Sequence, residues 1–343
     1  MPDFPLSVLT WNLYLGADVS RVIGVEPALL PARVAKVWEI VNKTNFCLRA
    51  KTIAAAICRE QPDVIALQEV CRWSTVYRLP LDREWRPEIV EYDFLRILLD
   101  ELNALGENYF AAVRSPGVDV LLPAAHGPDI RLEDSLVILL RTGKAGTGRT
   151  WAKPRSGRFA ANLRTTLDEE PFEIKRGWVS VDLHKGDRAV RIINTHLEFF
   201  SAAVQPSQLA EILNGPAKFS GPVLLTGDFN AHPGSVTWST LRKAGYNDAW
   251  EAAGAGPGHT SGRNEDLRDS HPALKARIDW TMYRGPIQVR QVSLVGADQS
   301  DRALGGLWPS DHAGLCTKVS VQQLGTLPRK TSLQESGELL EAV

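Results

Sequence analysis

Short runs of apolar, mostly branched residues recur along the chain and are separated by clusters of turn-forming residues. Runs of this length between turn signals are typical of buried strands. They predict eight strands, at residues 6–13, 64–67, 136–140, 178–183, 190–195, 223–226, 278–283 and 289–295. Apolar positions with a period of about 3.6 residues predict helices at residues 50–60, 94–105, 208–213 and 236–244. The pattern therefore indicates a mixed α/β protein.

Three stretches lack a clear period and are predicted to be loops, at residues 16–45, 72–86 and 254–271. Long loops in compact domains are usually functional or disordered. The sequence has no internal repeat of fixed period, so one copy of each motif is the simpler interpretation. We expect one domain over residues 1–324 and a polar C-terminal tail over residues 325–343.

The composition narrows the class of protein. With 44% hydrophobic and 23% charged residues, the chain can bury a sizeable core. Its 39 Lys and Arg residues against 40 Asp and Glu residues give a net charge of -1, so no overall positive field attracts a polyanion. A nucleic-acid partner would need local basic patches.

The four cysteines, Cys47, Cys58, Cys71 and Cys316, form no C-x-x-C pair. This argues against a zinc site and an oxidising compartment, and we expect all four to be small buried residues. Residues 1–5 lack the basic segment of a signal peptide, and no apolar run approaches the roughly 18 residues of a membrane span. A cytoplasmic location without a transmembrane segment is therefore predicted, and no protein partner can be inferred.

The strongest chemical signal is Gly227-Asp228-Phe229-Asn230, at the end of an apolar strand. Because side chains alternate along an extended backbone, Asp228 and Asn230 point the same way. A carboxylate and an amide placed like this can position a water and hydrogen-bond a phosphoryl oxygen. The alternative is an Asp-x-Asn turn, and taken alone the two interpretations are evenly matched.

Two more polar side chains stand at strand ends in the first part of the chain. Glu69 follows the predicted strand at 64–67, and Mg²⁺ prefers carboxylate ligands that are held rigidly. Asn12 ends the first predicted strand, where it is either a second, neutral metal ligand or a group that orients Glu69. The alternatives are a solvated Glu69 at the start of a loop and a turn-forming Asn12.

Histidines and acids follow the same pattern later in the chain. His196 ends a strand, where an imidazole can donate to a phosphate oxygen or assist a leaving group. Asp279 is predicted to hold one nitrogen of His312, which raises the basicity of the imidazole and makes it a cationic phosphate-binding group. Asp311 is then free to face a metal. The alternatives are a structural His, a strand Asp bonded to backbone, and a Ser-Asp turn.

The number of these motifs decides between catalysis and structure. Six separate structural explanations would have to hold together if none of the motifs took part in chemistry. The sequence therefore predicts a divalent-metal-dependent phosphoesterase.

The motifs also resemble, in order along the chain, those of the endonuclease/exonuclease/phosphatase superfamily of DNase I-like phosphoesterases. The resemblance covers residues 6 to about 321 and includes Trp11-Asn12, Leu67-Gln68-Glu69-Val70, Asn194-Thr195-His196-Leu197, Gly227-Asp228-Phe229-Asn230, Arg277-Ile278-Asp279 and Ser310-Asp311-His312. It implies a four-layered α/β sandwich of two packed, mainly antiparallel sheets flanked by helices. It also implies Mg²⁺ as the cofactor, with Mn²⁺ as a substitute.

The resemblance implies a role for each matching residue. Glu69 binds Mg²⁺, and Asn12 and Asp311 lie close to the same metal. Asp228 orients or activates the attacking water, and Asn230 stabilises the developing charge.

The remaining matching residues face the phosphate. His312, held by Asp279, binds the scissile phosphate, and His196 contacts the phosphate or the leaving group. Tyr14 stands where some abasic-site endonucleases carry a further metal-binding acid. The long segment 16–45 also exceeds what a minimal repair nuclease needs, so the chain resembles the DNase I and sphingomyelinase side of the superfamily more.

Loops that leave the strand ends of Asn12 and Glu69 are predicted to form the rim of the site. One of them, residues 72–86, mixes basic and aromatic side chains suited to phosphates and bases. Its predicted substrate-binding residues are Arg72, Trp73, Tyr77, Arg78 and Arg86. The alternative is a packing segment with buried Trp and solvated Arg residues. The basic residues within 153–164 have the same two interpretations, a nucleic-acid grip or a charged surface hairpin.

The sequence thus predicts a Mg²⁺-dependent phosphodiesterase that acts on nucleic acid as an endonuclease or exonuclease. Two alternatives within the enzymes are a sphingomyelinase-like phospholipid phosphodiesterase and an inositol-phosphate-type phosphatase. A third is a catalytically inactive scaffold that binds phosphate. Retention of every proposed catalytic residue argues against the scaffold.

Overall fold

The computed structural model describes residues 4–77, 87–142, 149–270 and 274–322. One sheet contains the strands β1 Phe4–Asn12, β2 Val64–Gln68, β3 Arg72–Val76, β4 Glu88–Asp93, β5 Tyr109–Leu122, β6 Asp129–Arg141, β15 Ile287–Val295 and β16 Gly314–Val321. Their order is β15-β16-β1-β2-β6-β3-β4, and β5 pairs with β6.

A second sheet contains the strands β7 Arg149–Arg158, β10 Gly177–Lys185, β11 Arg188–His196, β12 Val223–Asp228, β13 Asn247–Asp248 and β14 Asp279–Arg284. Their order is β13-β14-β12-β11-β10-β7. The strands β8 Leu163–Leu167 and β9 Glu170–Ile174 form a separate hairpin. Most pairings in both sheets are antiparallel, and β1–β2 and β11–β12 are parallel.

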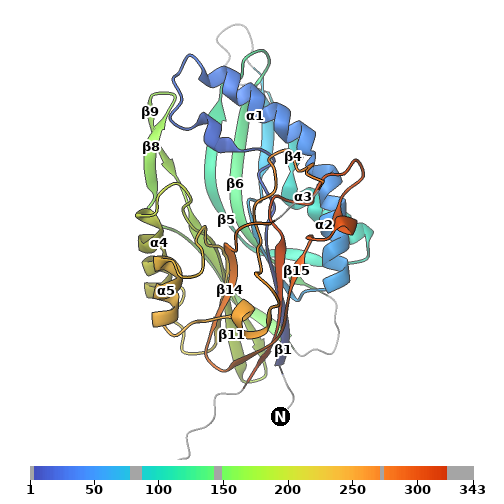
Figure 1. Cartoon of the computed structure of the whole chain (residues 1–343), viewed down its shortest axis with the longest axis vertical. Helices are drawn as coiled ribbons and strands as arrows, with labels where there is room; N and C mark the ends of the chain where they lie inside the picture. Colours follow the sequence, from blue (N-terminus) through green and yellow to red (C-terminus); the bar gives the residue numbers. More distant parts are fainter. Residues whose placement is uncertain (1–3, 78–86, 143–148, 271–273, 323–343) are drawn as a thin grey trace, which may run out of the picture.

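Helices cover the outer faces of the two sheets (Figure 1). Beside the first sheet lie α1 Leu30–Thr44, α2 Phe46–Glu60 and α3 Phe94–Ala104, and beside the second lie α4 Val204–Asn214 and α5 Val236–Lys243. The short elements are η1 Val19–Val22, α6 Ala249–Ala253 and η2 Gln299–Asp301. The predicted four-layered α/β sandwich is confirmed.

The two-residue period of the strands divides the core into three layers. Val8 and Ile192 belong to the apolar cluster between the sheets. Leu9, the next residue along β1, packs instead with Ile53 under the helices of the first sheet. Ile193 packs with the helices of the second sheet. Each sheet is therefore buried on both faces over much of its length.

The strand pairings bring the ends of several strands to one end of the sandwich. In the parallel pair β1–β2, Asn12 lies opposite Gln68, and in the parallel pair β11–β12, His196 lies opposite Asp228. The antiparallel strand β14 begins beside the end of β12, with Asp279 opposite Asp228. Strand β16 begins beside the end of β1. Backbone pairing therefore brings the strand ends that carry or adjoin the predicted site residues together from both sheets.

Buried amides tie the two sheets together at this end. Gln68 Nε2 donates to Asn194 Oδ1 at 2.7 Å, and Asn194 Nδ2 donates to the carbonyl oxygens of Leu67 and Val137 at 2.9 and 3.1 Å. Both side chains are fully buried. Since a buried amide without partners costs about 1–3 kcal/mol, this network fixes the spacing of the sheets.

The predicted helices and strands match elements of the structure, apart from their ends, but the predicted loop at 16–45 is wrong, and the predicted loop at 72–86 begins with the strand β3. Residues 30–44 form α1, with apolar positions at helical spacing. Pro31 looks like a helix breaker, yet it lies in the first turn, where its missing N–H costs nothing. Strands such as β5 and β7 were not predicted, because one face is exposed and their apolar runs are weak. Cys47 is exposed and Cys58 is half-buried, against the expectation that all four cysteines are buried.

Two further expectations concern the C-terminal tail and membrane-spanning segments. The predicted tail 325–343 lies outside the described residues. Among the described helices, none has the length and apolar character needed to cross a bilayer.

Gly227 is predicted to be essential for the turn of β12 into the site. Its φ is +139°, and a Cβ there would lie 2.0 Å from the Thr195 carbonyl oxygen. Gly227→Ala should therefore lower the free energy of unfolding, by about 1–3 kcal/mol from backbone strain with the steric overlap in addition. Urea unfolding would measure the loss.

Gly186→Ala is the matched control, because Gly186 also has a positive φ, +61°, but open space around it. An equal loss of stability in both variants would contradict the close approach of β11 to Gly227.

Candidate active site

Asn12 connects two acids across the two sheets. Its Nδ2 donates to Glu69 Oε1 and to Asp228 Oδ2, both at 3.0 Å. Its Oδ1 accepts from the backbone N–H of Tyr14 at 2.9 Å. The amide therefore presents its nitrogen to the acids and orients both of them. For Asn12 to serve as a metal ligand, its Oδ1 would have to bind the ion through its second lone pair, beside the hydrogen bond from Tyr14.

Glu69 occupies a constrained position at the end of β2. Its φ is +55°, and its Oε2 accepts from the Leu15 backbone N–H at 2.6 Å. Burial, followed by the charges of Asp311 and Asp134, raises the pKa of Glu69 to about 8. A carboxylate in this environment favours a cation as its neighbour.

Asp228 lies between two imidazoles at the end of β12. Its Oδ2 is 3.6 Å from His196 Nε2 and 3.9 Å from His312 Nε2, and its Oδ1 accepts from the Asn230 N–H at 2.9 Å. Burial and the nearby Asp279 raise its pKa to about 6. The group is thus ionised at neutral pH but is a stronger base than an ordinary Asp.

Asn230 does not continue the extended strand. Its φ is +47°, and its Nδ2 donates to the Leu197 carbonyl oxygen at 3.0 Å. The Asn230 backbone N–H, rather than its side chain, contacts Asp228. Asn230 thus lies beside Asp228 as predicted, but its side chain points toward Leu197 instead of the same way as Asp228.

Asp279 and His312 form the expected pair, with 2.8 Å between Asp279 Oδ2 and His312 Nδ1. Burial alone would lower the pKa of His312, but the charges of Asp279 and Asp311 outweigh it and hold the pKa well above its usual range. Nδ1 is engaged by Asp279, so Nε2 is the nitrogen left to face a substrate. His312 is therefore a cationic donor.

Asp311 is placed by the loop that precedes β16. Ser310 Oγ donates to the Asn12 carbonyl oxygen at 2.7 Å and accepts from the His312 N–H at 3.1 Å. This turn fixes Asp311 next to the end of β1. Burial raises the pKa of Asp311.

His196 has a partner that was not predicted. Arg176 Nη1 lies 2.7 Å from His196 Nδ1. A guanidinium has only donors, so Nδ1 must be the acceptor and the imidazole must be neutral, with its proton on Nε2. Burial and the charge of Arg176 lower the pKa of His196 in agreement with this assignment. His196 is therefore a neutral hydrogen-bond donor at the site.

Two buried arginines hold the loops that carry the acids. Arg49 donates to the carbonyl oxygens of Leu13, Tyr14 and Pro309 at 2.6–3.1 Å. Arg263 donates to the carbonyl oxygens of Ser310, His312 and Gly296 at 2.7–3.1 Å. Burial lowers the pKa of both to about 10.

Neither arginine belongs to a local motif. Apart from the carbonyl of Thr44, five residues away, the backbone carbonyls that Arg49 bonds lie about 35 to 260 residues away along the chain, and no sequence pattern marks such contacts. Arg176 and Asp134 were missed for the same reason.

The donor set fits a hard divalent cation. Glu69 and Asp311 are half-buried acids whose charges repel, and oxygen ligands of this kind suit Mg²⁺. Asp228, Asp279 and His312 also lie close enough to hold an ion. We assign that second group to water and phosphate instead, because Asp279 Oδ2 is already engaged by His312 Nδ1 at 2.8 Å.

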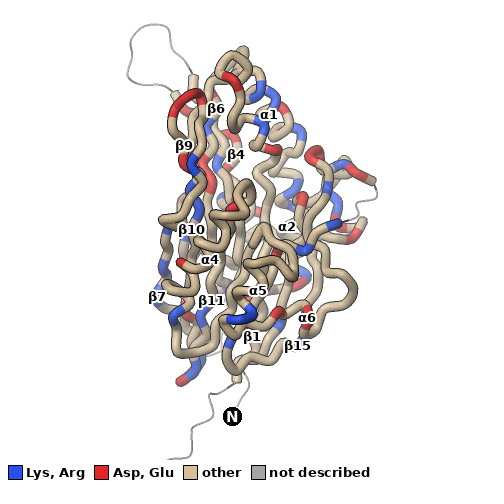
Figure 2. The backbone as a smooth tube through the Cα atoms, turned by 60° about the vertical axis from the view of Figure 1, so that its left-hand side comes forward, with Lys and Arg blue, Asp and Glu red and all other residues tan. Residues whose placement is uncertain are grey.

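The predicted substrate-binding residues differ in how accessible they are to a substrate. Arg72 forms ion pairs with Glu133 and Glu88. Trp73 is 2% exposed and donates to the Leu15 carbonyl oxygen, so it offers no open stacking face to a base. Tyr77 is 43% exposed, and Arg78 and Arg86 lie outside the described residues. The basic residues of β7 line one edge of the second sheet (Figure 2).

A family model for the endonuclease/exonuclease/phosphatase family matches residues 9–312. The chain belongs to this family. Its members are in general hydrolytic phosphoesterases, which agrees with the reaction class predicted from the motifs. No curated protein sequence matches the chain.

Solved structures share the fold at low sequence identity. A family member from Bacteroides thetaiotaomicron has a TM-score of 0.59 at 16% identity, with 94% of this chain and 96% of that chain covered. D. rerio TDP2 complexed with a single-strand DNA product has a TM-score of 0.55 at 15% identity, with 92% and 99% covered. A Beutenbergia cavernae member has a TM-score of 0.55 at 20% identity, with 92% and 72% covered.

Glu69 generates a prediction about metal and stability. Its pKa is raised from the ordinary 4.5 to about 8, so the folded protein binds this proton more tightly than the unfolded chain. The contribution of Glu69 to stability therefore falls as pH rises from about 4.5 to 8. At pH 8 in EDTA, Glu69→Gln should melt at a higher temperature than the wild type, and Mg²⁺ should raise the Tm of the wild type more.

Differential scanning fluorimetry with and without Mg²⁺ measures both effects. Glu170→Gln, at an exposed acid, is the control and should behave as the wild type. An equal Mg²⁺-induced rise in the wild type and in Glu69→Gln would contradict a role for Glu69 as a ligand.

Proposed function

We propose that the chain is a divalent-metal-dependent hydrolase of phosphodiesters. The observation that carries the proposal is the position of Asp228, which lies within 4 Å of the Nε2 atoms of two imidazoles and is joined to Glu69 through Asn12. A base, a cationic donor, a neutral donor and a metal-binding acid thus converge on one small volume. This set matches the needs of in-line attack by water on a phosphate.

Each residue has a distinct task in this proposal. Glu69 and Asp311 hold Mg²⁺, which neutralises phosphate charge when bound. Asp228 accepts the proton of the attacking water. Asn12, which donates to both acids, holds the Asp228 carboxylate in a fixed position relative to Glu69. Asn230 contributes by fixing Asp228 through its backbone N–H.

The two histidines bind different parts of the phosphate. His312 is held in its cationic form by Asp279, and its Nε2 donates to a non-bridging oxygen. His196 is neutral and donates through Nε2 to the phosphate or to the leaving-group oxygen. Because Arg176 occupies its Nδ1, His196 stabilises charge as a hydrogen-bond donor rather than as a cationic acid.

Nucleic acid is the substrate class that the comparison with D. rerio TDP2 supports, since that protein was solved with a single-strand DNA product. The local evidence for it is weaker than the sequence indicated, because Arg72 is ion-paired and Trp73 is buried. A second substrate class, a phosphodiester with an apolar substituent, is favoured by a cavity beside Glu69.

Asp228→Asn should lower kcat/KM at least about 100-fold, because it removes the proton acceptor. The assay is hydrolysis of bis(p-nitrophenyl) phosphate and of single-stranded DNA with Mg²⁺ or Mn²⁺. EDTA should abolish the wild-type activity. The exposed Asp100→Asn is the control, and both variants should keep the wild-type Tm within a few degrees. Wild-type protein that cleaves neither compound with either metal would refute the proposal.

Asp279→Asn should change the pH dependence of catalysis. Asp279 raises the pKa of His312 through both its charge and its hydrogen bond, so without Asp279 this pKa falls and His312 loses its proton at lower pH. The alkaline limb of the kcat/KM profile should therefore move to lower pH. A profile with the same alkaline limb as the wild type, at reduced height, would show that the pair only supports the structure.

A further inference from the structure

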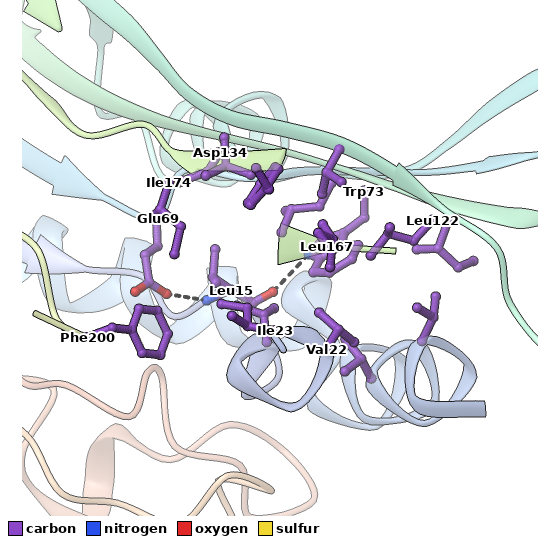
Figure 3. A pocket seen from close by; sticks show the side chains of 18 of the residues that line it. Leu15, Val22, Ile23, Glu69, Trp73, Leu122, Asp134, Leu167, Ile174 and Phe200 are labelled. Carbon is purple, nitrogen blue, oxygen red and sulfur yellow. Dashed lines mark hydrogen bonds between the residues drawn. The ribbon is translucent and has the colours of Figure 1, made fainter. Parts of the chain in front are cut away.

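An apolar cavity of about 100 Å³ opens beside Glu69 (Figure 3). Its walls come from the η1 and α1 region, from the long strands β5 and β6, and from the β8–β9 hairpin. Glu69 and Phe200 lie at one end of the cavity and Leu122 lies toward the other. The cavity therefore extends from the metal-binding acid into a space between separate elements of the fold.

The chemistry of the lining changes along the cavity. Of the lining residues within the described part of the chain, Glu69, Asp134 and Arg176 carry charge and the others are apolar. Glu69 and Arg176 both act at the active site, the first through Asn12 and the second through His196. The rest of the wall is made of residues such as Val22, Val120 and Phe172. The cavity is charged where it meets the active site and apolar beyond it.

We infer that this cavity binds an alkyl group attached to the phosphate of the substrate, so that the enzyme acts on amphiphilic phosphodiesters. This inference rests on the proposed function. A phosphate between Glu69 and His312 would direct one ester substituent toward the cavity mouth. Transfer of an alkyl chain from water into the cavity would lower the free energy of binding, and the chain has no polar group that needs a hydrogen bond from the walls.

A nucleobase suits the same space poorly. An engineered apolar cavity of about 150 Å³ takes one benzene ring, so about 100 Å³ leaves little room for a base. The polar edges of a base would also lie against walls without donors or acceptors, and unpaired buried groups are costly. A flexible alkyl chain meets neither obstacle.

The β8–β9 hairpin links the cavity to the catalytic histidine. Leu167, Phe172 and Ile174 of the hairpin line the cavity. Arg176 follows Ile174 by two residues and bonds to His196 Nδ1. A chain that packs against this wall would therefore help to hold Arg176, and through it the proton of His196, in place.

The test uses alkylphosphonates of increasing length as probes, with the wild-type protein and Mg²⁺. Isothermal titration calorimetry would give Kd for methyl-, propyl-, pentyl- and octylphosphonate. Burial of each methylene should lower Kd roughly fourfold until the cavity is full, after which Kd should level off. Because this readout needs no turnover, it is independent of the hydrolysis assay.

Cavity-filling variants locate the effect. Val120→Phe and, as a second choice, Val22→Phe place a larger side chain in the cavity and should reduce the ratio of the methyl to the pentyl Kd at least tenfold. Val236→Phe makes the same substitution at a 68% exposed position on α5 and should keep the wild-type ratio. Thermal unfolding would verify that each variant is folded.

The outcomes separate this inference from the proposed function. A Kd that does not depend on chain length in the wild type overturns the inference, even if phosphodiesters are hydrolysed. The same ratio in Val120→Phe and in the wild type also overturns it. Length-independent phosphonate binding together with cleavage of single-stranded DNA would favour nucleic acid instead. If no phosphonate binds, methylphosphonate included, the phosphate site itself is refuted.

Discussion

The concentration of negative charge at one end of the sandwich is the constraint on which the site depends. Glu69, Asp134, Asp228 and Asp311 all have raised pKa values, primarily because they are buried. Such a group of acids can persist in a folded protein only if donors and cations surround it. The amide of Asn12, the imidazolium of His312 and the guanidinium of Arg176 all serve this purpose, and the proposed metal completes it.

The loops around the acids are held by buried arginines, which also bring positive charge close to these acids. Arg49 and Arg263 are buried cations, yet their hydrogen bonds go to backbone carbonyls rather than to the acids. Each brings positive charge close to the acidic cluster while locking two or more loop segments. The Gln68–Asn194 amide pair also holds segments together, but without charge. It fixes the distance between the two sheets whose strands β2 and β12 lead to Glu69 and Asp228.

Much of the fold and the grouping of the candidate site residues could be predicted, because both have local signatures. A strand that ends in Gly-Asp or Gln-Glu is visible in the sequence, and parallel pairing then brings such ends together. Orientation could not be predicted: the Asn12 amide faces the acids with its nitrogen, and the Asn230 side chain turns toward Leu197. The roles of Arg176, Arg49 and the cavity arise from contacts between distant segments, and Trp73 was predicted to meet substrate from a composition that equally suits packing.

The pairing of β1 with β16 has a consequence for how activity arises during protein synthesis. Asn12 lies on the first strand, whereas Asp311 and His312 immediately precede the last described strand, which pairs with β1 from Phe4↔Val321 to Thr10↔Leu315. A growing chain on the ribosome can form β1, β2 and much of both sheets, but it holds an incomplete set of acids and no cationic imidazole. The proposed hydrolytic activity would therefore require that translation has passed β16 and that this strand has closed the sheet, so a product truncated before β16 would lack it.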